Sequence, residues 1–72
     1  MSIKKELLNE LTEQQLKDFA QHKGIKFKLN RIKENYYAGW DERDKIIDLM
    51  SDKEDLTVRE IEEFIKQQNN LL

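Results

Sequence analysis

Hydrophobic residues recur along much of this chain at the spacing of one face of a helix. The clearest window carries Leu16, Phe19 and Ala20, and the equivalent positions of a later window are taken by Ile61 and Phe64. Polar and charged residues fill the positions between them, as on a half-buried amphipathic helix. The pattern predicts a short helix over residues 3–9 and longer helices over residues 12–23, 41–51 and 57–68.

Two of these helices begin with nearly the same phrase, "LTEQQLKDFA" from Leu11 and "LTVREIEEFI" from Leu56. Each phrase places Thr at the N-cap and Gln or Glu three residues later, which is the arrangement of a capping box. We interpret the phrases as two complete helix starts. The alternative is a duplicated helix whose second unit is truncated, which would make the natural protein continue beyond Leu72.

Single residues mark the other helix boundaries. Ser2 and Asp41 are suitable N-cap residues for the first and third predicted helices. Gly24 is expected to end the second in the left-handed conformation that glycine adopts without strain.

Residues 25–39 follow a different pattern. Apolar and polar residues alternate over "IKFKLN", which starts at Ile25, and this period of two is typical of an extended segment with one buried side. The apolar side chains should turn inward, so that the polar ones turn outward together. From Leu29 onward the spacing changes to that of a short helix, which has Asn30 as its cap and should end near Gly39. Because an isolated strand has no partner to pair with, we expect no sheet.

We therefore predict an all-α fold: one small helical domain over residues 1–72, a bundle of about four helices around a helix–extended–helix core. A chain of 72 residues buries only about 60% of its unfolded surface, so each large apolar side chain matters. The predicted core contains Leu7, Leu8, Leu11, Leu16, Phe19, Ile25, Phe27, Ile32, Trp40, Ile46, Ile47, Met50, Leu56, Ile61, Phe64 and Ile65.

Composition narrows the functional classes. Charged residues make up 39% of the chain, Cys and Pro are absent, and there is one His, which leaves neither a disulfide nor a metal-ligand set. No Gly-rich phosphate loop and no nucleophile–base spacing is present. We expect no catalytic residues, no metal and no cofactor, and hence a protein that is not an enzyme and has no small-molecule substrate.

No apolar run is long enough to cross a membrane. We expect a soluble intracellular protein of the cytoplasm, nucleoid or nucleus without membrane contact.

The net charge of −2 is unevenly distributed. Residues 23–33 contain five basic residues and no acidic one, whereas residues 34–72 contain five basic and eleven acidic residues. Several cations on one face are what phosphate binding requires. The candidate nucleic-acid-binding residues of this segment are Lys23, Lys26, Lys28, Arg31 and Lys33.

Three aromatic residues follow the basic segment. Tyr36, Tyr37 and Trp40 are near enough in the sequence to stack on bases. The alternative is that the cations only balance the acidic helices, while Tyr36 and Trp40 belong to the core.

The stretch from Leu11 to Met50 resembles a SAP-type helix–extended–helix domain, particularly the divergent SAP-like variants found in RING-type ubiquitin ligases and in an ER-resident neurotrophic factor family. The resemblance covers roughly residues 11–51. It depends on two groups of residues: Leu11, Leu16, Lys17, Phe19, Gly24 and Ile25, then Gly39, Glu42, Arg43, Ile46, Ile47 and Met50.

The resemblance implies contacts with DNA, or with proteins in the divergent variants, and adds Arg43 to the candidate nucleic-acid-binding residues. Two departures from the family pattern are visible. The connection between Gly24 and Gly39 is longer than usual, and three acidic residues surround Arg43.

The sequence favours a non-catalytic nucleic-acid-binding module whose partner is DNA. Because the acidic remainder repels polyanions, binding should be weak and sensitive to salt. The alternative is a protein–protein interaction module of a larger protein or complex, which uses its acidic helix faces or the apolar pair Leu71 and Leu72. In either case we expect a free-standing small protein or an N-terminal module.

Overall fold

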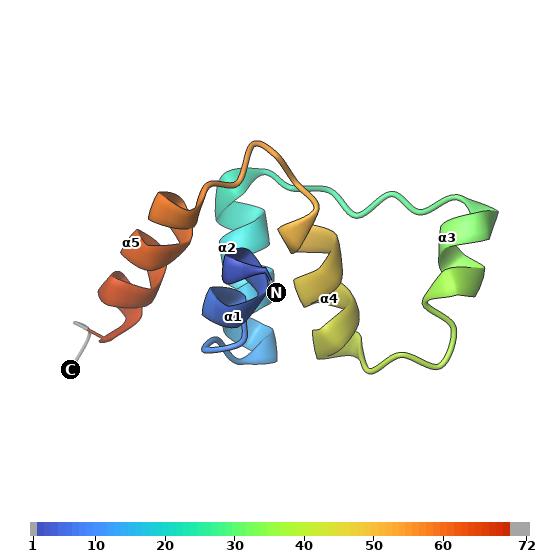
Figure 1. The fold of residues 1–72 in the computed structure, drawn as a ribbon, viewed down its shortest axis with the longest axis horizontal. Helices are drawn as coiled ribbons and strands as arrows, with labels where there is room; N and C mark the ends of the chain where they lie inside the picture. The colour runs from blue at the N-terminus through green and yellow to red at the C-terminus, as the bar shows by residue number, and fades with distance from the viewer. Residues whose placement is uncertain (1, 70–72) are drawn as a thin grey trace.

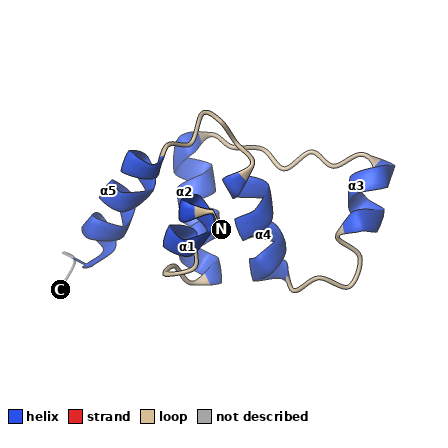
Figure 2. Ribbon diagram, viewed as in Figure 1, coloured by secondary structure: helices blue, strands red, loops and turns tan. Residues whose placement is uncertain are grey.

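The computed structural model describes residues 2–69, and Figure 1 shows their arrangement. In chain order the helices are α1 (Ile3–Leu8), α2 (Glu13–Lys23), α3 (Arg31–Tyr36), α4 (Glu42–Ser51) and α5 (Val58–Asn69). These residues contain no strand (Figure 2). The prediction of a small all-α bundle is confirmed. The fifth helix is α3, which lies in the connection where a short helix was expected.

The two similar phrases are both helix starts with complete capping boxes. The Thr12 hydroxyl accepts from the Gln15 backbone N–H at 3.2 Å, and the Gln15 side chain accepts from the Thr12 backbone N–H at 2.9 Å. Thr57 and Glu60 repeat this exchange at 3.2 and 3.3 Å. Each box satisfies amide donors that a helix start would otherwise leave unpaired.

The other predicted caps behave differently from one another. The Ser2 side chain accepts from the Lys5 backbone N–H, and the Asn30 side chain accepts from Lys33 at 2.8 Å. Asp41 occupies the N-cap of α4 as predicted, but its side chain makes no capping hydrogen bond. Acidic residues Glu42 and Asp44 in the first turn favour the positive end of the helix instead.

The core lies where α1 packs against α4 and α5, and where α2 packs against α4. The rings of Phe19 in α2 and Phe64 in α5 are stacked, with centroids 4.3 Å apart. The buried cluster consists of Leu8, Leu11, Leu16, Phe19, Ala20, Ile46, Ile47, Met50, Leu56 and Ile61. Leu7, Ile25, Phe27, Phe64 and Ile65 are half-buried against it.

Two predicted core residues are exposed. Ile32 is 79% exposed and Trp40 is 41% exposed. Both belong to the part of the chain that runs through α3, which lies apart from the other four helices at one end of the molecule (Figure 1). Because α3 has only six residues and no helix beside it, its apolar side chains find little to pack against.

Three buried residues are absent from the predicted core, namely Ala20, Tyr37 and Leu49, although Ala20 belongs to the predicted apolar face of its helix. Leu49 is absent from the predicted core, yet it is buried, and it lines the same hollow as Phe27 and Leu29 of the extended segment. None of the helices over residues 2–69 combines the length and the apolar character needed to cross a membrane.

Candidate functional site

The candidate site begins where α2 ends. Gly24 has φ 71° and ψ 24°, and its backbone N–H donates to Ala20 and Gln21. The next amide, that of Ile25, donates to the Ala20 carbonyl at 2.8 Å. This left-handed C-cap turns the chain out of the helix and into an extended path. We call residues 25–40, which run from this turn to the residue before the α4 cap, the connecting arm.

The first six residues of the connecting arm alternate as the sequence predicts. Ile25, Phe27 and Leu29 are half-buried, and the residues between them are exposed. Ile25 and Phe27 pack against the core cluster. The pleated geometry of an extended chain therefore directs Lys26 and Lys28 away from the core together.

The two exposed lysines border a hollow of about 330 Å³ between the connecting arm and the end of α4. Four lysines line it, Lys26, Lys28, Lys33 and Lys53, together with one carboxylate, that of Asp52. Its other lining residues are Phe27, Leu29, Asn30 and Leu49. We call this hollow the basic groove. Its lysines are close enough in space to act on one polyanion, although Lys53 is distant from the others in sequence.

Four cations of the basic segment form none of the ion pairs found among the described residues: Lys26, Lys28, Arg31 and Lys33. All four are exposed. Arg31 is the first residue of α3 and does not line the basic groove. These cations are therefore available to an external anion.

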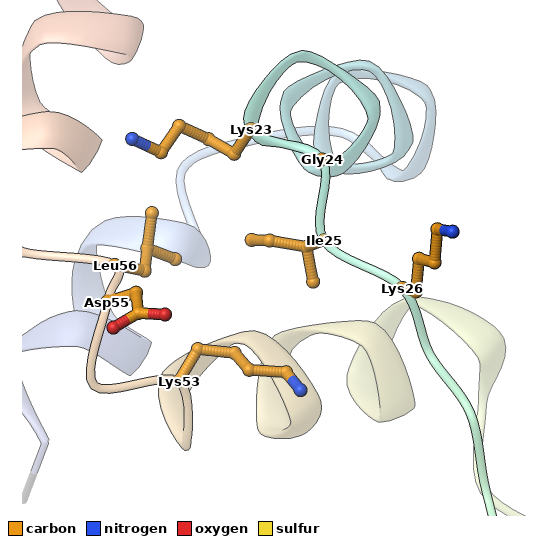
Figure 3. A pocket seen from close by; sticks show the side chains of 7 residues that line it. All are labelled: Lys23, Gly24, Ile25, Lys26, Lys53, Asp55 and Leu56. Atoms are coloured by element: carbon orange, nitrogen blue, oxygen red, sulfur yellow. The ribbon is translucent and has the colours of Figure 1, made fainter.

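Lys23 differs from the other cations of the basic segment. It forms an ion pair with Glu60 of α5. Figure 3 shows its amine directed toward α5, while Ile25 points toward Leu56 and Lys26 points to the other side of the extended segment. These residues line a separate hollow of about 290 Å³, which is also lined by Asp55 and Lys53. Lys23 thus joins α2 to α5 within the protein.

Arg43 also has an internal role in the structure. Its guanidinium donates to the backbone carbonyl of Leu11 at 2.7 and 3.0 Å. It also donates to the carbonyl of Asn9 at 2.6 Å and to that residue's side-chain oxygen at 3.0 Å. The side chain was predicted to assist nucleic-acid binding, but here its donors are occupied by the turn between α1 and α2. Arg43 instead fastens that turn to α4.

Lys53 was missed by the sequence reasoning. It lies between acidic residues in "SDKED", so the local charge pattern hides it. The loop that carries it is held by Lys4 of α1, whose ammonium donates to the Lys53 carbonyl at 2.9 Å. Only the return of the chain after α4 brings Lys53 beside the connecting arm.

The far end of the connecting arm is anchored by one carboxylate. Asp48 of α4 accepts a hydrogen bond from the Tyr37 hydroxyl at 2.6 Å and pairs with the Lys5 ammonium at 2.7 Å. These two bonds, that of Lys5 first, hold the pKa of Asp48 below its ordinary value. Burial and the bond to Asp48 raise the pKa of Tyr37, which stays protonated as a donor. The bond to Asp48 likewise raises the pKa of Lys5.

Three aromatic rings meet around this anchor. Tyr37 is buried, and its ring meets the edge of Tyr36 at a centroid distance of 4.9 Å and that of Trp40 at 5.1 Å. The Tyr36 and Trp40 rings lie 5.5 Å apart. Because Tyr37 is fixed by Asp48, it supports Tyr36, which remains 62% exposed. The expected aromatic group therefore exists, with one buried member and two exposed ones.

Within residues 2–69 no group of His, Asp and Glu side chains is arranged to hold a metal ion. Comparison of the chain with protein-family models, with curated proteins and with solved structures found no match.

Proposed function

We propose that this protein is a nucleic-acid-binding module that uses the basic groove. The observation that carries the proposal is the gathering of four lysines around one hollow with a single carboxylate. Each phosphate contact made by a lysine releases condensed counterions, and this release supplies most of the affinity of sequence-independent binding. Lys26, Lys28, Lys33 and Lys53 supply the contacts, and Arg31 adds an exposed cation at the start of α3. Lys23 and Arg43 are left out because their internal partners already engage them.

The remainder of the protein limits the strength of this binding. The net charge of −2 is negative, and the acidic residues lie mainly in the second half of the chain. Long-range repulsion therefore opposes the attraction of the basic groove. We expect dissociation constants of about 10⁻⁴ to 10⁻⁶ M at physiological salt, as for other sequence-independent binding.

The proposal is tested by fluorescence anisotropy with labelled single-stranded and duplex DNA over a range of salt concentrations. Four phosphate contacts give a slope of log K against log salt of about −3 to −4. The double variant Lys26→Gln/Lys28→Gln should make this slope shallower by about 1.5. The matched control Arg59→Gln/Lys66→Gln removes the same charge from α5, at the opposite end of the molecule from α3 (Figure 1).

Only the control should keep the wild-type slope. An equal loss in both variants would mean that net charge, not the basic groove, governs binding. Absence of binding even at low salt would reject the proposal.

A protein-interaction module is the second candidate, and the exposed apolar residues of the connecting arm favour it. Ile32, Tyr36 and Trp40 are all large and exposed, and exposed apolar groups that lie together are typical of docking surfaces. The acidic helix faces offer further contacts, whereas Leu71 and Leu72 lie outside the described residues. This candidate would be supported if no nucleic acid binds at low salt.

The SAP-like resemblance remains a proposal. In its support, a capped helix, an extended segment and a second amphipathic helix occur in the expected order as α2, residues 25–30 and α4. The insertion of α3 accounts for the unusual length of the connection.

A further inference from the structure

We infer that the ligand of the basic groove is a single strand of nucleic acid, and that one of its bases stacks on Tyr36. This inference depends on the proposed function and specifies the form of the ligand. It is based on a hollow that adjoins the basic groove and is lined by this exposed aromatic side chain.

This adjoining hollow, which we call the aromatic hollow, has a volume of about 430 Å³. It is lined by Ile32, Lys33, Tyr36, Tyr37, Asp48 and Asp52. Lys33 and Asp52 also line the basic groove, so the two hollows are adjacent and share these two residues. A chain that lies along Lys26 and Lys28 therefore reaches Tyr36 after it passes Lys33.

The charges of the aromatic hollow permit a phosphate chain to enter from the basic groove. Of its two carboxylates, Asp48 is already engaged by the Lys5 ammonium and the Tyr37 hydroxyl. Asp52 remains, and it lines both hollows together with Lys33. The phosphates should therefore follow the lysines, while the uncharged bases enter the aromatic hollow.

The ring of Tyr36 is preorganised for stacking because the neighbouring rings of Tyr37 and Trp40 restrict its movement. Its ring meets Tyr37 edge-on at an interplanar angle of 82° and lies against Trp40 at a tilt of 41°. Tyr37 is in turn bound to Asp48 of α4. A ring that is exposed but braced loses little conformational freedom when a base stacks on it, which favours binding.

A duplex fits this arrangement less well than a single strand. The lysines line a hollow together with Phe27, Leu29 and Leu49, and a rigid duplex would not follow the inside of such a hollow. The bases of a duplex are also stacked on one another and cannot reach Tyr36. A single strand follows a curved path of cations and exposes its bases to an aromatic side chain.

The experiment compares four labelled ligands of about ten nucleotides, within the site sizes of single-strand binders. They are oligothymidylate, oligouridylate, an abasic sugar–phosphate chain of the same length, and a duplex. Wild-type protein should bind the two oligonucleotides tighter than the abasic chain and the duplex. The difference between oligothymidylate and oligouridylate measures the preference for DNA or RNA.

The Tyr36→Ala variant should weaken binding of the two oligonucleotides about tenfold. Its affinity for the abasic chain should not change, because that chain has no base to stack. The conservative variant Tyr36→Phe keeps the ring and should bind like the wild type, and circular dichroism verifies that both variants are folded. The single tryptophan, Trp40, offers a second measurement: its fluorescence should change with the oligonucleotides and not with the abasic chain.

Two outcomes would overturn the inference in distinguishable ways. If Tyr36→Ala binds oligonucleotides like the wild type while Lys26→Gln/Lys28→Gln still weakens binding, the stacking inference is wrong and the proposed function stands. If wild-type protein binds none of the four ligands at low salt, both are rejected.

Discussion

Apolar residues have similar helical spacing in the helical core and in the connecting arm, but they are buried in the core and exposed in α3. In α2, Leu16, Phe19 and Ala20 share one helical face and are all buried. In α3, Ile32 and Tyr36 also share a helical face, yet both are exposed. The difference is that α2 lies among other helices, whereas α3 lies at the end of an extended segment (Figure 1). Helical spacing therefore predicts that a helix forms, and burial requires a neighbour as well.

The two regions also use their cations differently. In the helical core, Lys23 and Arg43 bind groups of the protein itself. In the connecting arm, Lys26 and Lys28 face outward with no carboxylate within ion-pair distance among the described residues. We expect substitutions in the core to change stability and substitutions in the arm to change binding. Four predictions test this division, from the largest expected effect on stability to the smallest.

The largest effect is expected for Phe19→Ala in the centre of the core. This change removes a buried ring that stacks on Phe64, and such truncations cost about 3–5 kcal/mol. A domain of this size has a free energy of unfolding of only about 4–11 kcal/mol, so the variant will be close to unfolding at room temperature. Urea denaturation followed by circular dichroism measures the loss. A cost below 1 kcal/mol would contradict the packing described here.

A smaller effect is expected for Arg43→Ala. The guanidinium donates to the carbonyls of Asn9 and Leu11, and loss of these charge-assisted bonds at a partly exposed position should cost about 1–2 kcal/mol. Nucleic-acid binding by the folded variant should not change, because these donors are occupied inside the protein. Paired denaturation and anisotropy measurements provide the check. If the variant were as stable as the wild type but bound nucleic acid more weakly, Arg43 would be part of the nucleic-acid-binding site.

Asp48→Asn tests the anchor between the two regions. The pKa of Asp48 is lowered from its ordinary value of 3.8, so the ionised carboxylate stabilises the folded state above that pH. This contribution is lost as the pH falls through the lowered pKa of the folded state. We expect the variant to be less stable than wild type by about 1 kcal/mol at neutral pH.

The stability difference between Asp48→Asn and wild type should become smaller as the pH is lowered below about 4, because protonation removes the same charge from the wild type. Thermal unfolding at several pH values follows this convergence. The exposed neighbour Asp52 provides the matched control, since Asp52→Asn removes an equal charge at a carboxylate that forms no ion pair among the described residues. A constant difference across the pH range would mean that the charge of Asp48 does not stabilise the anchor.

The smallest effect on stability is expected for Ile32→Ser. Because this side chain is 79% exposed, the free energy of unfolding should change by less than about 0.5 kcal/mol. The same measurement as for Phe19→Ala is used, which makes the two variants a direct comparison of arm and core. A loss of several kcal/mol would show that α3 packs against the helical core in solution and would remove the distinction between the two regions.

Much of the secondary structure could be predicted because it depends on residues close together in the chain. Thr12 and Gln15 are three positions apart, so their capping box forms within one turn of helix. The alternation from Ile25 to Asn30 likewise determines which side chains share a side of an extended chain. Asp41 shows the limit of such reasoning, since a suitable cap residue at the right position makes no capping bond.

The candidate site was only partly predictable. The basic segment identified Lys26, Lys28, Arg31 and Lys33 as exposed cations, and they are exposed. It gave no sign that Lys53 lies beside them or that Lys23 pairs with Glu60. These relations join residues separated by whole helices, and they depend on how the helices pack.

By itself, the sequence determined that helices form, where most of them begin, and which side of residues 25–30 is charged, because local hydrogen bonds and side-chain alternation act over a few residues. Tertiary structure decided which apolar residues are buried and which cations remain available. Tyr37 is buried and Trp40 is exposed, although both are aromatic residues of the same arm. The hydroxyl of Tyr37 reaches Asp48 of α4, and burial is favourable where a polar group finds such a partner and the ring finds neighbours.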